Sequence, residues 1–133
     1  MINWNNMDTL ASYAALKAAE PVKLAAAMSG ENGAERVKKY SVPMGCGLDF
    51  NFGARPVNDE ILAIMADFAK EQQLVEKFAE LYNGAVINTG EKRRVLHHMC
   101  RGQLGEAVIA DGVDKREFYL GEQKKIAEFA AKV

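Results

Sequence analysis

The segment Asn88–Gly102, NTGEKRRVLHHMCRG, concentrates the side chains that most often perform chemistry in proteins. It holds three arginines, one lysine, two histidines and a cysteine in fifteen residues. These types occur in metal centres, thiol nucleophiles, phosphate clamps and nucleic-acid-binding surfaces. Whether they act together depends on the element that positions them. Asn88 and Glu91 have the spacing of a helix capping box, which predicts a helix over residues 89–101.

The two histidines of this predicted helix do not converge. Adjacent helical residues lie about 100° apart, so His97 and His98 point in different directions. Metal-binding histidines of a helix are usually four residues apart, and a structural or solvated role is therefore favoured over a metal site. Cys100 falls on the apolar stripe of the helix, where a cysteine behaves as a small buried hydrophobe. We expect no metal and no cofactor here.

The remaining chemistries of the segment and of the second cysteine are not favoured either. Cys46 lies between two glycines and could be exposed, but no neighbour in sequence activates its thiol. Lys92, Arg93, Arg94 and Arg101 have the charge for phosphate contacts with nucleic acid. No helix-turn-helix glycine turn or interleaved aromatic residue accompanies them, and the net charge of the chain is −1. Ion pairing with acidic neighbours is the interpretation we favour, with no nucleic-acid partner.

The bulk properties are those of one globular domain, and we expect a single segment over residues 1–133. The hydrophobic fraction is 49% and the charged fraction is 26%, both ordinary values. No apolar run approaches the roughly 20 residues that span a bilayer, so no membrane partner is expected. The opening MINWNNMDTL lacks the features of a secretion signal. Two cysteines make no disulfide framework, and a reduced cytoplasmic location is the simplest interpretation.

The patterning predicts a mainly α fold with one small β-hairpin. Leu48, Phe50 and Phe52 alternate with polar residues or glycine, which is typical of a half-buried strand. Asp8 is a plausible first N-cap, and Asn58 is a good N-cap for the clearest helix. Helices are expected at about 8–20, 22–29, 32–39, 58–72, 74–83, 89–101 and 114–132, with the hairpin at about 41–54.

Local signals also place the ends of the later elements. Asn83-Gly84 should end the helix over 74–83, because either residue can adopt the left-handed C-cap conformation. Residues 108–110 are expected to be extended before the turn Asp111-Gly112. Asp114 should then cap the last helix.

The last helix has two unusual features. Glu122 projects into the middle of an apolar face, and Gly121 costs about 1 kcal/mol relative to alanine in a helix interior. A close backbone approach, or a partner for Glu122, would explain them. The residues of the apolar face are Phe118, Tyr119, Ile126, Phe129, Ala130 and Val133.

No catalytic constellation emerges from the residue types and their spacing. SGENGAE and GCGLDFNFG contain glycines, but neither matches the P-loop or the G-x-G-x-x-G fingerprint. Carboxylates are abundant but alternate with lysines on predicted helix surfaces, where most would be solvated. They are Asp59, Glu60, Asp67, Glu71, Glu76 and Glu80.

The order of segments resembles the N-terminal region of glucose-6-phosphate isomerases, also called phosphoglucose isomerases. VINTGEKRRVLHHMCRG is similar to a family segment of the form isoleucine-asparagine-x-threonine-glutamate-x-arginine-x-valine-leucine-histidine, followed by a small residue pair and arginine. Gly90 stands at the usual threonine, Arg94 at the usual alanine, and Met99-Cys100 at the usual alanine-leucine. The resemblance extends over the whole chain. The matching signature positions are Ile87, Asn88, Glu91, Arg93, Val95, Leu96, His97 and Arg101.

The resemblance implies an N-terminal helical layer of an α/β sugar-isomerase enzyme, without its parallel-sheet domains. Family members are several times longer and interconvert glucose 6-phosphate and fructose 6-phosphate through an enediol. Their catalytic glutamate, histidine, arginine and lysine, and the domains that cradle the phosphate, would lie downstream of this region. No catalytic or substrate-binding residue carries over. The signature residues are expected to be structural, and the isolated chain is expected to be inactive.

Two functions remain open at this point. The chain is either part of such an isomerase, as a fragment or one piece of a split enzyme, or a non-catalytic interaction module derived from the family. In the first case its partner is the remainder of the isomerase. In the second, exposed apolar faces would dock a partner or mediate self-association.

Overall fold

The computed structural model describes residues 2–102 and 105–132, which fall into two compact units. The N-terminal unit comprises residues 3–72. The C-terminal unit comprises Ile2 and the described residues from Gln73 onward. The division falls at Gln73, whose φ of 51° is left-handed. That residues 1–133 form one segment stays a prediction.

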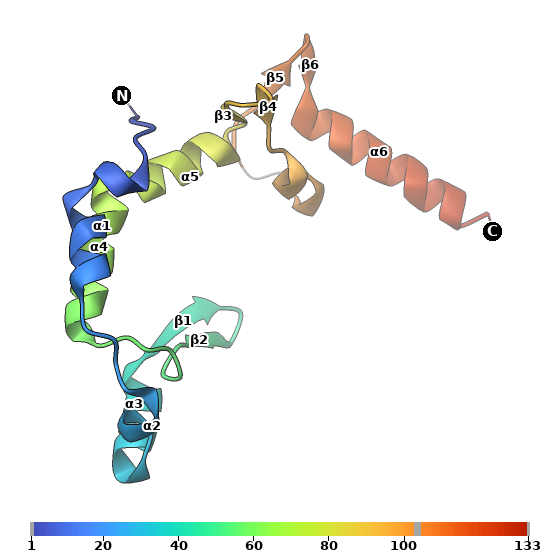
Figure 1. The fold of residues 1–133 in the computed structure, drawn as a ribbon. Helices are drawn as coiled ribbons and strands as arrows, with labels where there is room; N and C mark the ends of the chain where they lie inside the picture. Colours follow the sequence, from blue (N-terminus) through green and yellow to red (C-terminus); the bar gives the residue numbers. More distant parts are fainter. Residues whose placement is uncertain (1, 103–104, 133) are drawn as a thin grey trace. The chain divides into compact units, whose positions relative to one another are not determined.

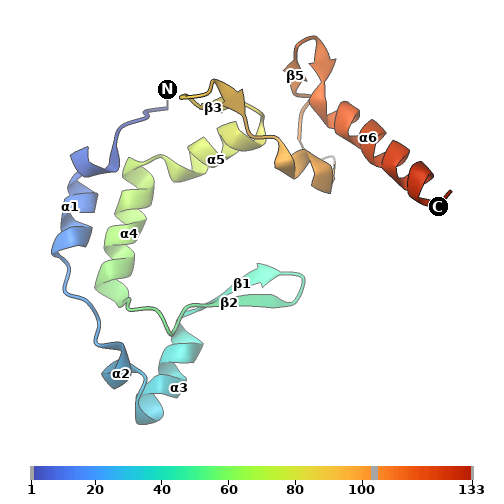
Figure 2. The same cartoon turned by 45° about the vertical axis from the view of Figure 1, so that its right-hand side comes forward.

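The N-terminal unit is built from helices and one hairpin. Its helices α1 and α4 lie side by side in both views (Figure 1 and Figure 2), with the rings of Tyr13 and Phe68 6.1 Å apart. The elements are η1 (Met7–Thr9), α1 (Ala11–Ala18), α2 (Leu24–Ala27), α3 (Gly30–Lys39), β1 (Ser41–Gly45), β2 (Leu48–Asn51) and α4 (Asp59–Glu71).

The beginning of α4 is confirmed and that of the first helix is not. The Asn58 side chain accepts a hydrogen bond from the Ile61 amide at 2.8 Å, and Ile61 is buried. Asp8, expected as an N-cap, instead lies inside the 3-10 turn η1. Leu10 occupies the N-cap position of α1 and makes no side-chain cap. The amides of α1 therefore need an acceptor from elsewhere in the chain.

Arg36 of α3 ties the hairpin β1–β2 to the start of α4. Its Nε donates to the Gly53 carbonyl at 2.7 Å, and its Nη2 donates to those of Arg55 at 2.8 Å and Val57 at 2.6 Å. The guanidinium lies 4.6 Å from the ring centroid of Tyr40, which is buried. These donors pair the carbonyls of a segment that has no secondary structure of its own.

The C-terminal unit differs from its prediction in number of strands. The one hairpin expected for the chain, at 41–54, is present in the N-terminal unit. The C-terminal unit contains two further antiparallel pairs, β3–β4 and β5–β6, that were not predicted. Its elements are α5 (Leu74–Tyr82), β3 (Val86–Asn88), β4 (Arg93–Arg94), η2 (His97–Arg101), β5 (Ile109–Ala110), β6 (Val113–Asp114) and α6 (Lys115–Ala130).

The helix predicted over residues 89–101 is wrong, although its capping signal is real. The Asn88 side chain accepts from the Glu91 amide and donates to the Glu91 carboxylate, both at 3.2 Å. These bonds close the turn between β3 and β4 instead of starting a helix, and Lys92, with φ 54°, reverses the chain. An asparagine that bonds the backbone three residues on satisfies a turn as well as a helix end.

The end of α5 is confirmed at Asn83-Gly84. The Gly84 amide donates to the Leu81 carbonyl and the Ala85 amide to that of Glu80, the two bonds of a Schellman motif. Gly84 has φ +76°. A Cβ at this residue would lie 2.4 Å from Cγ1 of the buried Val108, so both the backbone and the packing require glycine.

The cap of α6 is also confirmed. Asp114 Oδ1 accepts from the Arg116 amide at 3.0 Å and from the Val108 amide at 3.3 Å. The second bond brings the extended residues before β5 to the beginning of α6. Residues 109–110 and 113–114 pair around the expected turn.

One of the two unusual features of α6, the position of Glu122, has a local explanation. Glu122 pairs with Lys125 one turn on, at 2.6 Å. No described atom lies within 4 Å of a Cβ built at Gly121, so a close backbone approach is not found there. Phe118, Ile126 and Phe129 are exposed, and Val133 lies outside the described residues. None of the described helices is long and apolar enough to cross a membrane.

Replacing Gly84 by alanine should destabilise the C-terminal unit. The new Cβ would collide with Val108 and force a left-handed φ on a non-glycine residue, which together should lower the free energy of unfolding by about 2–4 kcal/mol. Urea unfolding followed by circular dichroism measures this. Gly90→Ala is the matched control, because its Cβ would meet nothing closer than 3.7 Å. Equal stability of the two variants would contradict the role of Gly84.

Candidate functional site

Seven of the signature residues, all those other than Ile87, do not gather into one site. Three lie on the exposed hairpin β3–β4, where Arg93 Nη1 is 3.8 Å from Glu91 Oε2. Two are half-buried between β4 and η2, and two are exposed on η2. The residues on the hairpin are Asn88, Glu91 and Arg93. Those between β4 and η2 are Val95 and Leu96, and those on η2 are His97 and Arg101.

The residues that the fold does bring together surround the main-chain carbonyl of Tyr82. His98 Nε2 lies 2.8 Å from this oxygen, and Arg116 Nη2 donates to it at 2.9 Å. The His98 ring stacks on the Tyr82 ring with centroids 4.8 Å apart. The Arg116 guanidinium lies 5.2 Å from the same ring, and its Nε donates to the Glu106 carbonyl at 2.6 Å. Arg116 is only 2% exposed.

This Tyr82 cluster, formed by Tyr82, His98 and Arg116, is a structural tie. It connects the end of α5, the turn η2 and the beginning of α6 through two side-chain donors and one carbonyl. A ring nitrogen that faces a carbonyl oxygen at this distance donates to it, so His98 Nε2 carries a proton. The hydrogen bonds of its side chains go to main-chain carbonyls. The structural interpretation is thus confirmed for His98, while His97 is exposed.

Arg116 was not identified from the sequence, and no local signal marks it. It stands in the charged run DKRE at a helix start, which usually faces solvent. Its partners are main-chain carbonyls 34 and 10 residues earlier in the chain. Every residue has a carbonyl, so such partners carry no sequence pattern.

Both cysteines are exposed, which confirms the expectation for Cys46 and corrects the one for Cys100. The error came from the helical wheel. Turn η2 is a 3-10 helix with about three residues per turn, so its faces differ from those of an α-helix. Met99 is the buried residue instead, at 1% exposure, and the Cys100 carbonyl accepts from Gln123 of α6.

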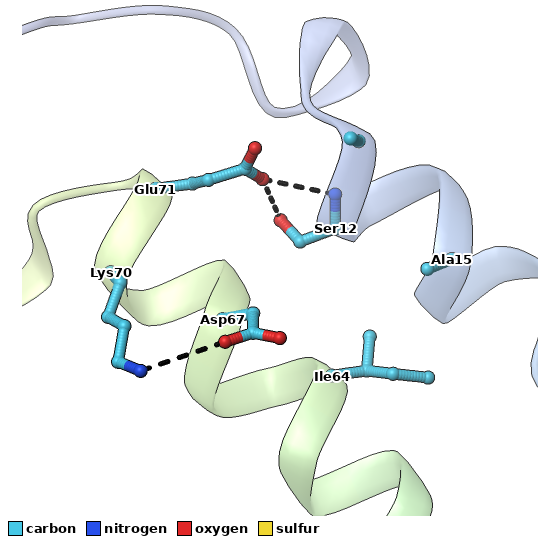
Figure 3. Close-up of a pocket in the computed structure, with 7 residues that line it drawn as sticks. Ser12, Ala15, Ile64, Asp67, Lys70 and Glu71 are labelled. Atoms are coloured by element: carbon cyan, nitrogen blue, oxygen red, sulfur yellow. Dashed lines mark hydrogen bonds and ion pairs between the residues drawn. The ribbon is translucent and has the colours of Figure 1, made fainter.

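A hollow of about 550 Å³ between α1 and α4 is lined by two carboxylates, Asp67 and Glu71 (Figure 3). Both carboxylates already interact with other side chains of this chain. Glu71 accepts hydrogen bonds from the Ser12 hydroxyl and, at 3.0 Å, from the Ser12 amide. These bonds lower the pKa of Glu71, the hydroxyl contributing most. Glu71 is one of six carboxylates, most of which were expected to be solvated. Instead it supplies the acceptor that Leu10 cannot offer to the first turn of α1.

Among residues 2–102 and 105–132, no group of three histidine, cysteine, aspartate or glutamate side chains is placed to hold a metal ion. The best-defined contacts of Arg36, Arg116 and Asn58 pair main-chain groups at or near element ends.

Comparison with known proteins gives a consistent relationship over the chain. A sequence model of the family described as phosphoglucose isomerase matches residues 51–133. Glucose-6-phosphate isomerase of Treponema denticola is 48% identical, with 99% of this chain and 26% of the relative covered. That of Treponema pallidum strain Nichols is 41% identical (99% and 25%), and that of Borreliella burgdorferi strain ZS7 is 34% identical (100% and 25%). The chain spans about a quarter of the length of these relatives.

The stabilising effect of Glu71 should depend on pH. Its pKa is lowered from the usual 4.5 in the folded chain, so the ionised carboxylate stabilises the fold above that value. The contribution is lost as the pH falls through the lowered pKa. We expect Glu71→Gln to be less stable than the wild type at pH 7 and to converge with it in acid. Urea unfolding at stepped pH tests this, with Glu80→Gln as the control. A stability difference that persists in acid would contradict the assignment.

Removing the Arg116 donors should destabilise the C-terminal unit. Arg116→Met keeps the aliphatic stem but removes the side-chain donor of the Glu106 carbonyl and one of the two at the Tyr82 carbonyl, which keeps its contact with His98. An unsatisfied buried group costs about 1–3 kcal/mol, so we expect a loss in that range. Arg93→Met is the matched control and should change stability by less than about 0.5 kcal/mol. Chemical denaturation measures both; similar losses in the two variants would contradict the role given to the Tyr82 cluster.

Proposed function

The chain belongs to the phosphoglucose isomerase family, and from this premise we propose that it serves as the N-terminal part of a glucose-6-phosphate isomerase. Such an enzyme interconverts glucose 6-phosphate and fructose 6-phosphate in glycolysis and gluconeogenesis. The observation that carries the proposal is the match of nearly the whole chain to the N-terminal quarter of relatives that bear this name.

The geometry supports a scaffolding role within that enzyme. The polar side chains with the best-defined partners, Arg36, Glu71 and Arg116, bond the chain itself. We infer that the seven signature residues named above are likewise structural. We also infer that the catalytic and phosphate-binding groups belong to the remainder of the isomerase. A cytoplasmic location fits this metabolic role.

The uncovered apolar side chains favour docking of this chain against another protein surface. On α6, Ile126 is 67% and Phe129 is 71% exposed. On the hairpin β1–β2, Met44 and Leu48 are 66% and 65% exposed. Burial of such residues is a main source of free energy for association. We assign these faces to contacts with the remainder of the isomerase.

A non-catalytic interaction module is the second candidate, and the same exposed side chains favour it. The two functions differ in what the chain does with the rest of an isomerase. A module would self-associate or bind another protein without restoring turnover, whereas a part of the enzyme would restore it. Size-exclusion chromatography of the purified chain, alone and with the rest of an isomerase, reports association, and a coupled isomerase assay of the same mixture distinguishes the two functions.

The purified 133-residue chain should show no isomerase activity. A coupled assay of fructose 6-phosphate formation measures this, with the full-length Treponema denticola enzyme as the positive control. Turnover above background from the isolated chain would contradict the prediction.

A chimera tests whether the chain is part of an isomerase. Residues 1–133 replace the matching segment of the Treponema denticola enzyme, and the same enzyme without that segment is the negative control. We expect an active chimera and an inactive control. An Arg116→Met chimera should lose thermal stability along with activity, whereas an Arg93→Met chimera should not. A folded but inactive wild-type chimera would contradict the proposed function.

A further inference from the structure

A second hollow, in the C-terminal unit, gathers positive charge. It has a volume of about 440 Å³ and lies where the hairpins β3–β4 and β5–β6 meet the beginning of α6. Four cationic side chains line it, and one carboxylate accompanies them. The cations are Lys92, Arg93, Arg94 and Lys115, and the carboxylate is Asp111. We call this the cationic hollow.

The carboxylates nearby leave the hollow positively charged. Asp111 is 3.9 Å from Lys115, and its own side chain is 93% exposed. Glu91 is 3.8 Å from Arg93, and both of these side chains are exposed as well. Exposed pairs at such distances are weak and screened by salt. Even with both carboxylates counted, four cations face two anions, in a chain whose net charge is −1. The positive charge is therefore local.

Several of these cations are held in place by the fold. Arg94 donates to the Gly84 carbonyl, the residue that ends α5, and a guanidinium has five N–H donors, so others remain for a ligand. The Lys115 side chain is only 22% exposed, and its ammonium lies 5.6 Å from the Phe118 ring centroid. Lys92 stands at the left-handed position of the β3–β4 turn. Arg94 and Lys115, which these contacts restrain, lose less freedom on binding than unrestrained side chains would.

We propose that the cationic hollow binds a small phosphate-bearing anion. Guanidinium groups match phosphate oxygens in paired hydrogen bonds, and lysine ammonium groups add point charges. Four cations suit a group that carries two or more negative charges better than a single carboxylate. The half-buried Leu96 and the buried Ala110 also line the hollow, and apolar walls strengthen the attraction between ligand and cations. The volume falls in the range of small-molecule sites.

The site is a property of this chain and does not rest on the proposed isomerase role. All four cations that form it belong to this chain. A failed chimera would therefore leave this proposal standing, and absence of anion binding would leave the isomerase proposal standing.

Nuclear magnetic resonance of the full 133-residue chain provides the test. Inorganic phosphate is titrated into ¹⁵N-labelled protein, and sodium chloride is titrated separately to the same ionic strength. We expect phosphate to shift the amide signals of residues 92–94 and 110–115 in a saturable manner. Chloride should shift them far less. Equal effects of the two salts would overturn the proposal, because they would show charge screening only.

Variants locate the binding. Lys115→Gln and Lys92→Asn should each weaken phosphate binding at least threefold, and the double variant at least tenfold; asparagine is used because it tolerates the left-handed backbone. Lys124→Gln, a cation of α6 outside the hollow, is the matched control and should leave the dissociation constant unchanged. Arg94 is left intact because it also bonds Gly84. Equal affinity in the double variant and the control would overturn the assignment.

A third titration separates the class of ligand. A hexaglutamate peptide represents an acidic segment of a partner protein. Weaker binding of this peptide than of phosphate supports a small phosphate-bearing ligand. Tighter, saturable binding of the peptide would overturn that choice and assign the hollow to a protein partner.

Discussion

The Arg116 guanidinium, buried at the beginning of α6, donates to the carbonyl oxygens of Glu106 and Tyr82. The C-terminal unit depends on this pairing because the elements between α5 and α6 are short. Strands of two or three residues and a single 3-10 turn leave many main-chain groups unpaired within their own elements. His98 adds a second contact to the Tyr82 carbonyl, so α5, η2 and α6 meet at one oxygen atom.

The N-terminal unit meets the same constraint with different residues. Arg36 donates to the carbonyls of three alternate loop residues before α4, and Glu71 accepts from the first turn of α1. In both units a charged side chain from a helix therefore pairs main-chain groups that a longer strand or a side-chain cap would otherwise pair. Charge-assisted hydrogen bonds to main-chain groups are among the stronger polar contacts in proteins. Polar residues whose types suggest catalysis or binding can thus serve to stabilise the fold of the segment that carries them.

Many large apolar side chains of this chain are exposed, whereas few hydrophobic residues are buried. The buried hydrophobic residues among those described are Tyr40, Ile61, Met99, Val108 and Ala110. Large side chains such as Phe129, Ile126 and Met44 remain on the surface. A layer that pairs its main chain internally but leaves apolar faces uncovered is suited to packing against a larger body. This agrees with a chain that spans about a quarter of the length of its relatives.

The sequence by itself determined the features that rest on neighbouring residues. The caps at Asn58 and Asp114, the glycine that ends α5 and the turn before α6 were all predictable, because their hydrogen bonds join residues within a few positions. The family relationship was also readable from the signature. Only the tertiary structure decided that Asn88 and Glu91 close a strand turn, that Met99 and not Cys100 is buried, and that Arg116 and Glu71 serve as ties. Those outcomes depend on carbonyls and amides distant in sequence, which every residue carries and which no local pattern distinguishes.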